Sequence, residues 1–116
     1  MFKYENYKAN ITCLGLKDWD GIPAHKYKCK LINRDTGAAV PITYHKGAGH
    51  KDTRPTTQEI IQALVLDARA YLDTGTIQGF LSEFGGTREQ FNACAKAVEK
   101  CARLGIDPND SAFDEI

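Results

Sequence analysis

The sequence has no apolar run that approaches the roughly 18–20 residues needed to span a membrane. Residues 1–6 also lack the apolar stretch and the small-residue cleavage site of a secretory signal. Disorder is not favoured either, because 42% of the residues are hydrophobic and only 26% are charged. These absences predict a soluble globular protein of the cytoplasm.

Short-range pairs of metal-binding residues are missing as well. Zinc sites commonly use cysteines separated by two to four residues, and none of the four cysteines has such a neighbour. On a helix, Cys94 and Cys101 would lie about 10 Å apart along the axis, too far to share one ion. We therefore expect Cys13, Cys29, Cys94 and Cys101 to be reduced thiols that pack as small hydrophobic side chains, with no metal and no cofactor.

No catalytic motif stands out. The Gly-x4-Gly-Lys-Ser/Thr spacing of a phosphate-binding loop is absent, and no pair of carboxylates lies in an apolar setting. Asp18 and Asp20 flank Trp19 in a segment with glycine and proline, which predicts solvated carboxylates. The sequence thus predicts a protein that is not an enzyme. A small metal- or thiol-dependent enzyme stays an alternative, since a Cys–His pair forms in space rather than in sequence.

Charge of opposite sign is divided between the two halves of the chain, although the net charge is zero. Residues 1–54 hold ten Lys and Arg against five Asp and Glu, and residues 55–116 hold five against ten. One interpretation is that the halves attract each other or that molecules associate head to tail. The other is a basic face that meets phosphates and an acidic face that meets a different partner.

Alternation of apolar and polar residues predicts strands over residues 6–16, 26–33 and 39–45. The turn residues at 33–37 predict a hairpin between the last two strands. Residues 17–25 are expected to form a longer, irregular connection. Pro41 lacks an N–H group and predicts that the third strand lies at an edge.

Capping signals predict three helices in the second half of the chain. Capping boxes at residues 56–59 and 87–90 mark the start of the first and third helices, and Thr76 precedes the second. The helices should end near Gly75, Gly85 and Gly105.

The predicted fold class is therefore α+β: a three-stranded antiparallel β-meander followed by three α-helices packed on one sheet face. We expect a single domain over residues 1–116, with a β-sheet half (6–45), a helical half (56–105) and an acidic tail (106–116). The tail holds few large apolar residues, which favours mobility.

Basic residues form two candidate surfaces for an anion or a nucleic acid. Glycines in the loop before the first helix would let its backbone approach a phosphate. Alternating lysines would line the outer sheet face. The residues concerned are Lys46, Gly47, Gly49, Lys51 and Arg54 in the loop and Lys8, Lys26, Lys28 and Lys30 on the sheet. A solvated basic loop, and lysines that keep sheet edges from pairing, explain the same residues without a ligand.

Four short motifs carry a resemblance: Lys28-Cys29-Lys30-Leu31, Asp67-Ala68, residues 81–85 (Leu-Ser-Glu-Phe-Gly) and a last helix, residues 93–104, with cysteines. In this order they resemble small, mostly uncharacterised accessory proteins of tailed bacteriophages, although residues 80–81 and 86–87 depart from that pattern. The resemblance implies a non-catalytic protein in the host cytoplasm that binds a host protein or a nucleoprotein complex. An anti-CRISPR inhibitor that acts on a CRISPR effector is one such class.

Under this hypothesis an acidic surface mimics nucleic acid and occupies a cationic channel of the partner. The candidate partner-binding residues are Trp19, Asp107, Asp110, Asp114 and Glu115. Direct nucleic-acid binding by the lysines and the basic loop is the alternative.

Overall fold

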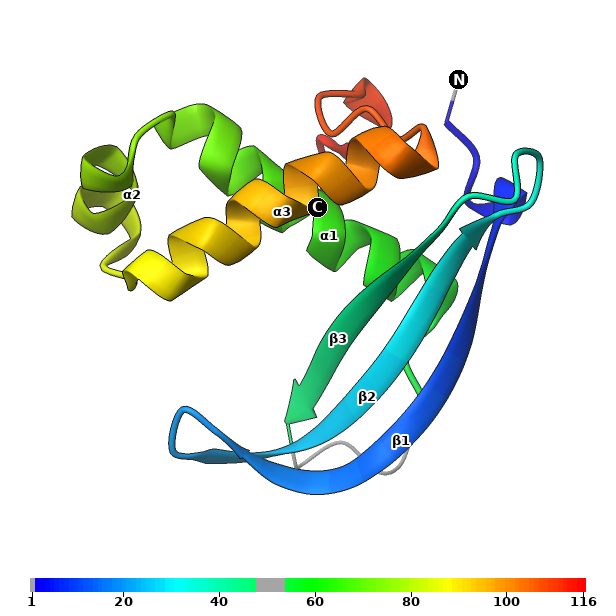
Figure 1. Cartoon of the computed structure of the whole chain (residues 1–116), viewed down its shortest axis with the longest axis horizontal. Helices are drawn as coiled ribbons and strands as arrows, with labels where there is room; N and C mark the ends of the chain where they lie inside the picture. Colours follow the sequence, from blue (N-terminus) through cyan, green and yellow to red (C-terminus); the bar gives the residue numbers. More distant parts are fainter. Residues whose placement is uncertain (1, 48–53) are drawn as a thin grey trace. The chain divides into compact units, whose positions relative to one another are not determined.

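Three strands and then three α-helices follow one another in the computed structural model, which describes residues 2–47 and 54–116 (Figure 1). The strands are β1 (Tyr7–Trp19), β2 (Ile22–Asn33) and β3 (Ala39–Gly47), and the helices are α1 (Thr57–Thr74), α2 (Ile77–Phe84) and α3 (Arg88–Leu104). Short 3-10 helices, η1 (Tyr4–Asn6) and η2 (Ser111–Phe113), lie near the two ends. The predicted α+β class is confirmed. Within the described ranges, no helix combines the length and the apolar character that crossing a bilayer would require.

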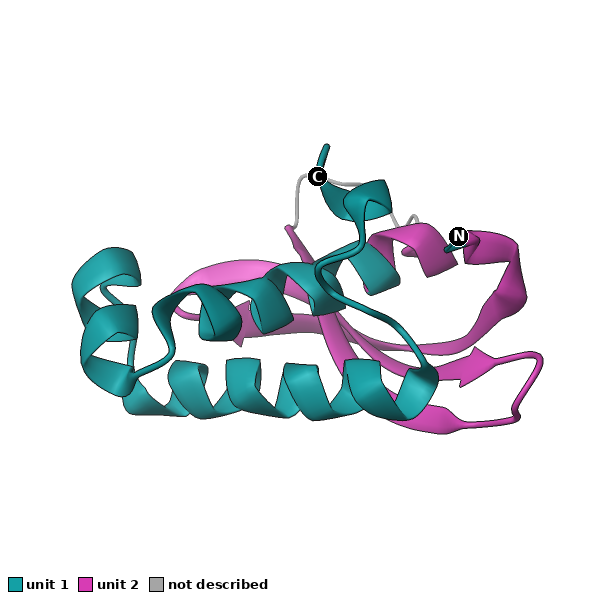
Figure 2. Ribbon diagram, turned by 90° about the horizontal axis from the view of Figure 1, so that it is seen from above, with its two compact units in different colours: residues 1–2, 61–116 teal, residues 3–60 magenta. Residues whose placement is uncertain are grey.

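The chain divides into two compact units (Figure 2). The sheet unit is Lys3–Ile60, and the helical unit combines Met1–Phe2 with Ile61–Ile116. The boundary falls inside α1, not in the connection before it. Charge follows the units: the sheet unit has ten Lys and Arg against six Asp and Glu, and the helical unit has five against nine. The net charges are therefore +4 and −4.

The sheet is an antiparallel meander with the order β1-β2-β3, so β3 is an edge strand, as Pro41 predicts. In the β2–β3 turn, the Asn33 side-chain oxygen accepts hydrogen bonds from the backbone N–H groups of Asp35 (2.9 Å) and Thr36 (3.3 Å). Gly37 adopts a φ of +76°, a backbone conformation that favours glycine. The predicted hairpin is confirmed.

The first connection is not the irregular loop that the sequence suggests. Residues 17–19 belong to β1 and residues 22–25 belong to β2, and only Asp20 and Gly21 lie between the strands. Both have positive φ, +50° and +81°, as a two-residue type I′ hairpin turn requires. Pro23 is tolerated near the start of β2 because, among the described residues, this end of the strand pairs with β1 alone: Pro23 lies opposite Asp18, and the β3 pairing begins at Ala24.

A β-bulge explains why the alternation becomes hard to recognise. The register between β1 and β2 shifts between Cys13 and Leu16, and Gly15 adopts a φ of +87° in this stretch. An extra residue in one strand reverses which positions face each side of the sheet. The period-two pattern of residues 6–13 therefore does not continue through residues 16–19.

In the helical unit, the predicted capping interactions are present at the starts of α2 and α3. Thr76 caps α2 through a hydrogen bond from the backbone N–H of Gly79, and a complete capping box at Thr87 starts α3. Rings from three helices meet inside this unit, with Phe91 of α3 5.2 Å from Tyr71 of α1 and 5.6 Å from Phe80 of α2 between ring centroids. Aromatic contacts of this kind stabilise the helix ends that they join.

Candidate functional site

Strand pairing places the sheet lysines on one face. Residues that lie directly opposite each other on neighbouring strands point to the same side, and successive residues of a strand alternate. Lys30 of β2 pairs with Asn10 and Pro41, and Lys28 pairs with Thr12 and Thr43. We call this side of the sheet the lysine face. Its charged members are Lys8, Lys17, Lys26, Lys28 and Lys30.

The opposite face has a different composition. It contains the buried side chains Tyr7, Tyr27, Cys29, Leu31 and Val40, which are at most 7% exposed. The lysines of the lysine face are exposed, except Lys26, which is half-buried. The sheet therefore separates an apolar buried side from a polar, positively charged side.

The strands contribute only positive charge to the lysine face. Within the three strands it carries no Asp or Glu, because Asp18 points to the other side. None of its five lysines forms an ion pair with any described residue. Lysines two positions apart on a strand are separated by about 6.6 Å, which is close to the spacing of successive phosphates in an extended nucleic-acid strand.

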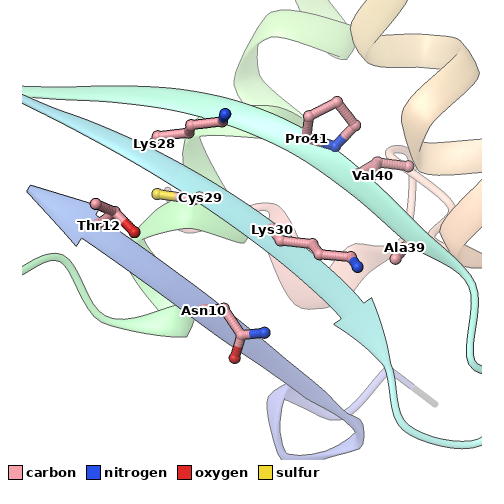
Figure 3. Close-up of a pocket in the computed structure, with 8 residues that line it drawn as sticks. All are labelled: Asn10, Thr12, Lys28, Cys29, Lys30, Ala39, Val40 and Pro41. Atoms are coloured by element: carbon pink, nitrogen blue, oxygen red, sulfur yellow. The ribbon is translucent and has the colours of Figure 1, made fainter. Parts of the chain in front are cut away.

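A shallow hollow of about 340 Å³ lies among these side chains (Figure 3). Lys28 and Lys30 on β2 stand between Asn10 and Thr12 of β1 and Pro41 of β3. The amide and hydroxyl groups can donate hydrogen bonds to an anion that the lysines attract.

The positions of the lysines also bear on the interpretation that they keep sheet edges from pairing, which we call edge protection. Lysine keeps sheets from associating when it lies on an edge strand, whose backbone groups are unpaired. Lys26, Lys28 and Lys30 lie on β2, which is paired on both sides along this stretch. Edge protection therefore does not account for three of the five lysines.

An aromatic pair lies on the lysine face as well. Trp19 is opposite Ile22, and His45 is opposite Lys26, so both share the side of the even-numbered lysines of β2. The rings are stacked, with centroids 5.0 Å apart and planes inclined by 4°. Burial, followed by repulsion from Lys26, lowers the pKa of His45, while Asp20 acts in the opposite direction. Nothing in the local sequence signals this position, because it depends on the bulge and on strand pairing.

The predicted basic loop lies only partly within the described residues. Gly49 and Lys51 lie outside them, and Gly47 ends β3 opposite Ala24. Lys46 points away from the lysine face and forms an ion pair with Glu59, at 3.4 Å between Nζ and Oε2. Arg54 donates a hydrogen bond of 2.9 Å to the backbone carbonyl of Ile11.

The N-terminus of α1 already has a carboxylate partner. The Glu59 side chain accepts a hydrogen bond of 3.0 Å from the Thr56 backbone N–H, which completes the predicted capping box. This hydrogen bond, aided by Lys46, lowers the pKa of Glu59 although burial opposes the shift. The positive helix end is therefore compensated within the protein, and we place no phosphate site there.

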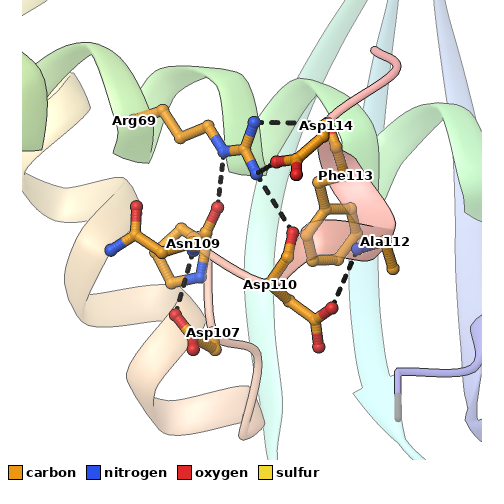
Figure 4. A network of polar contacts seen from close by, with 8 residues as sticks. Arg69, Asp107, Asn109, Asp110, Ala112, Phe113 and Asp114 are labelled. Atoms are coloured by element: carbon orange, nitrogen blue, oxygen red, sulfur yellow. Dashed lines mark hydrogen bonds and ion pairs between the residues drawn. The ribbon is translucent and has the colours of Figure 1, made fainter.

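The acidic tail is folded within the helical unit, contrary to the expected mobility (Figure 4). Arg69 of α1 donates hydrogen bonds to the backbone carbonyls of Pro108, Asp110 and Phe113 and forms an ion pair of 3.0 Å with Asp114. The Phe113 ring is fully buried. Sequence reasoning missed Arg69 because most of its partners are backbone carbonyls about 40 residues away.

Most of the carboxylates proposed for partner binding have roles in this segment. The Asp107 side chain accepts a hydrogen bond from the Asn109 N–H, and that of Asp110 accepts one from the Ala112 N–H, both at 2.9 Å. Asp114 is paired with Arg69, while Glu115 is exposed. These contacts orient the carboxylates toward their own chain.

The cysteines pack as predicted. Cys29, Cys94 and Cys101 are buried, Cys13 is half-buried, and all four are free thiols. Burial, followed by the charge of Asp67, raises the pKa of Cys94 and Cys101 to about 11, so both are protonated at neutral pH and are poor nucleophiles. Among the residues that the structure describes, no group of three or more His, Cys, Asp or Glu side chains could hold a metal ion.

Comparisons with other proteins add no family to this description. No protein-family model matches the chain, and no curated protein or solved structure matches it either. The lysine face is therefore interpreted from its own geometry and charge.

Proposed function

We propose that this protein binds nucleic acid through the lysine face. The observation that carries the proposal is the gathering of five lysines, without an acidic residue, on one side of the sheet. Three of them project from the central strand, where edge protection gives no reason for them.

The physical basis is electrostatic. Lysines that neutralise phosphates release the counterions condensed on a nucleic acid, and this release drives binding. The net charge of +4 on the sheet unit attracts the polyanion over a longer range. Asn10 and Thr12, which line the hollow beside Lys28 and Lys30, supply hydrogen bonds to phosphate oxygens.

The resemblance to phage accessory proteins suggests a different use, in which the acidic tail enters a cationic channel of a host complex. We prefer the lysine face for two reasons. Asp107, Asp110 and Asp114 engage groups of their own segment, and a partner would have to replace those contacts. The lysines of the lysine face have no such partners among the described residues.

The test is binding of a fluorescently labelled oligothymidylate of about 20 nucleotides, followed by anisotropy at low salt. Replacing Lys28 and Lys30 together by Gln should weaken binding by about tenfold or more, since two charge-assisted contacts are lost. The matched control replaces Arg88 and Lys96, two exposed cations of α3, by Gln. It removes the same charge from the helical unit, not from the lysine face, and should change the affinity by less than about threefold. Absence of binding to any nucleic acid at low salt would refute the proposal.

A further inference from the structure

We infer that the stacked Trp19–His45 pair is a platform for unpaired bases, which makes the lysine face selective for single-stranded nucleic acid. The inference rests on the proposed function, because the lysines must hold the phosphate backbone for a base to reach the indole. Both DNA and RNA single strands offer the required chemistry, a planar base next to a phosphate.

Part of the Trp19 side chain remains accessible to a ligand. His45 covers one face of the ring in a nearly parallel stack, yet Trp19 remains 45% exposed. A base that stacked on the other face would extend the same column of rings. Stacking of this kind accepts every base, since all bases have a flat π surface.

Large apolar side chains are exposed to solvent at the end of the hairpin that carries the turn at Asp20 and Gly21. Ile22, directly opposite Trp19 on the same face, is 58% exposed. Exposed large apolar side chains that lie together commonly mark a binding surface. Trp19 and Ile22 together form an apolar end to a face that is otherwise polar.

The lysines and the platform are suitably arranged for one ligand. His45 lies directly opposite Lys26, so the platform adjoins the first lysine of β2, while Ile22 lies about 13 Å from Lys26 along the strand. A single strand whose phosphates follow Lys30, Lys28 and Lys26 would bring its next bases toward Trp19. In a duplex the base faces are covered by their neighbours, and only the base edges are accessible in the grooves. The platform therefore favours single strands.

A purely structural role for the stack makes a different prediction. If the Trp19–His45 contact only holds the hairpin against β3, any large apolar side chain at position 19 preserves binding once the fold is intact. If bases stack on the ring, the aromatic character is required. Leu and Phe at position 19 separate these two explanations.

Trp19 is the chain's single tryptophan, so its fluorescence reports on this position alone. The unlabelled protein is titrated with 12-nucleotide oligothymidylate, oligouridylate, a 12-bp DNA duplex and inorganic polyphosphate, which has no bases. We expect both oligonucleotides to quench the emission and to bind at least about tenfold more tightly than the duplex. Polyphosphate should bind without comparable quenching. A difference between the two oligonucleotides would identify the preferred sugar through the 2′-hydroxyl.

The variants complete the test. Trp19→Leu should weaken oligothymidylate binding by about 5- to 150-fold, the range expected for loss of one stacked base, while the salt dependence set by the lysines stays the same. Trp19→Phe should bind within about threefold of the unmodified protein. Thermal unfolding checks that both variants fold. If Trp19→Leu does not fold, the quenching of the unmodified protein and its preference for single strands over the duplex decide the question.

The failures of the two proposals can be told apart. Equal affinity for duplex and single strand, absence of quenching, or full binding by folded Trp19→Leu refutes the platform, while lysine-dependent binding still supports the proposed function. If no polyanion binds at low salt, both proposals are refuted.

Discussion

The lysine face determines how steeply nucleic-acid binding should weaken as salt is added. For single strands, the logarithm of the affinity falls with the logarithm of the salt concentration with a slope of about −0.7 for each neutralised phosphate. If Lys8, Lys26, Lys28 and Lys30 each neutralise one phosphate, the expected slope is about −2.8. An increase from 50 to 200 mM salt should then reduce the affinity by about 50-fold.

Replacing Lys28 and Lys30 by Gln removes two of these four contacts. The slope should fall to about −1.4, so the same increase in salt reduces the affinity only about 7-fold. The measurement is the dissociation constant of a labelled oligothymidylate at four or more salt concentrations for each protein. The control variant, with Arg88 and Lys96 replaced by Gln, should keep a slope near −2.8.

The slope is more informative than the affinity at one salt concentration. A variant that is partly unfolded loses affinity at every salt concentration, but the slope of its folded fraction does not change. If the variant at Lys28 and Lys30 binds more weakly with an unchanged slope, these lysines do not contact phosphates, and the assignment of the lysine face is wrong.

Three further predictions concern stability, pH and thiol chemistry. Replacing Arg69 by Met should lower the free energy of unfolding by about 3 kcal/mol, because three backbone carbonyls lose their donor. Replacing Asp114 by Asn should lower it by less than about 1 kcal/mol, because the Asp114 side chain is 63% exposed. Equal shifts of the two urea midpoints would contradict this account of the C-terminal segment. Burial and Lys26 lower the pKa of His45 from its ordinary 6.5. Oligothymidylate affinity should therefore be constant above pH 7 and should increase only as acidification below about 6.5 protonates the ring. Replacing His45 by Gln should abolish that increase. A pKa of about 11 for Cys94 and Cys101 leaves about 100-fold less thiolate at pH 8 than an ordinary pKa of 9.0. Alkylation of these two cysteines should therefore be slower by about that factor in the folded than in the urea-unfolded protein, as measured by peptide mass spectrometry.

Local signals predicted the helical elements well because capping is a local interaction. Thr56 and Glu59, or Thr87 and Gln90, bond within four residues of each other, so the sequence alone contains both partners. Alternation along residues 26–33 likewise predicted a strand with lysines on one side.

Interactions between distant residues could not be predicted in the same way. Arg69 is bound mainly by backbone carbonyls, which carry no side-chain signature, so the folded tail was expected to be mobile. Lys46 was grouped with the anion-binding loop because of its charge, but it pairs with Glu59 on the other side of the sheet. Which of several cations faces a ligand is decided by strand register, and register depends on pairing.

The β-bulge connects the part of the fold and the part of the site that sequence reasoning missed. Before the bulge, the odd-numbered residues of β1, such as Cys13, point away from the lysine face. Without the extra residue, Trp19 would point the same way, toward the side of the sheet that carries Tyr27 and Leu31. The shift near Gly15 reverses this parity, and the two-residue turn at Asp20 and Gly21 then fixes Trp19 opposite Ile22. The same irregularity that hides the strand in the sequence thus brings the single tryptophan to the lysines, which is the arrangement that a single-strand binding surface requires.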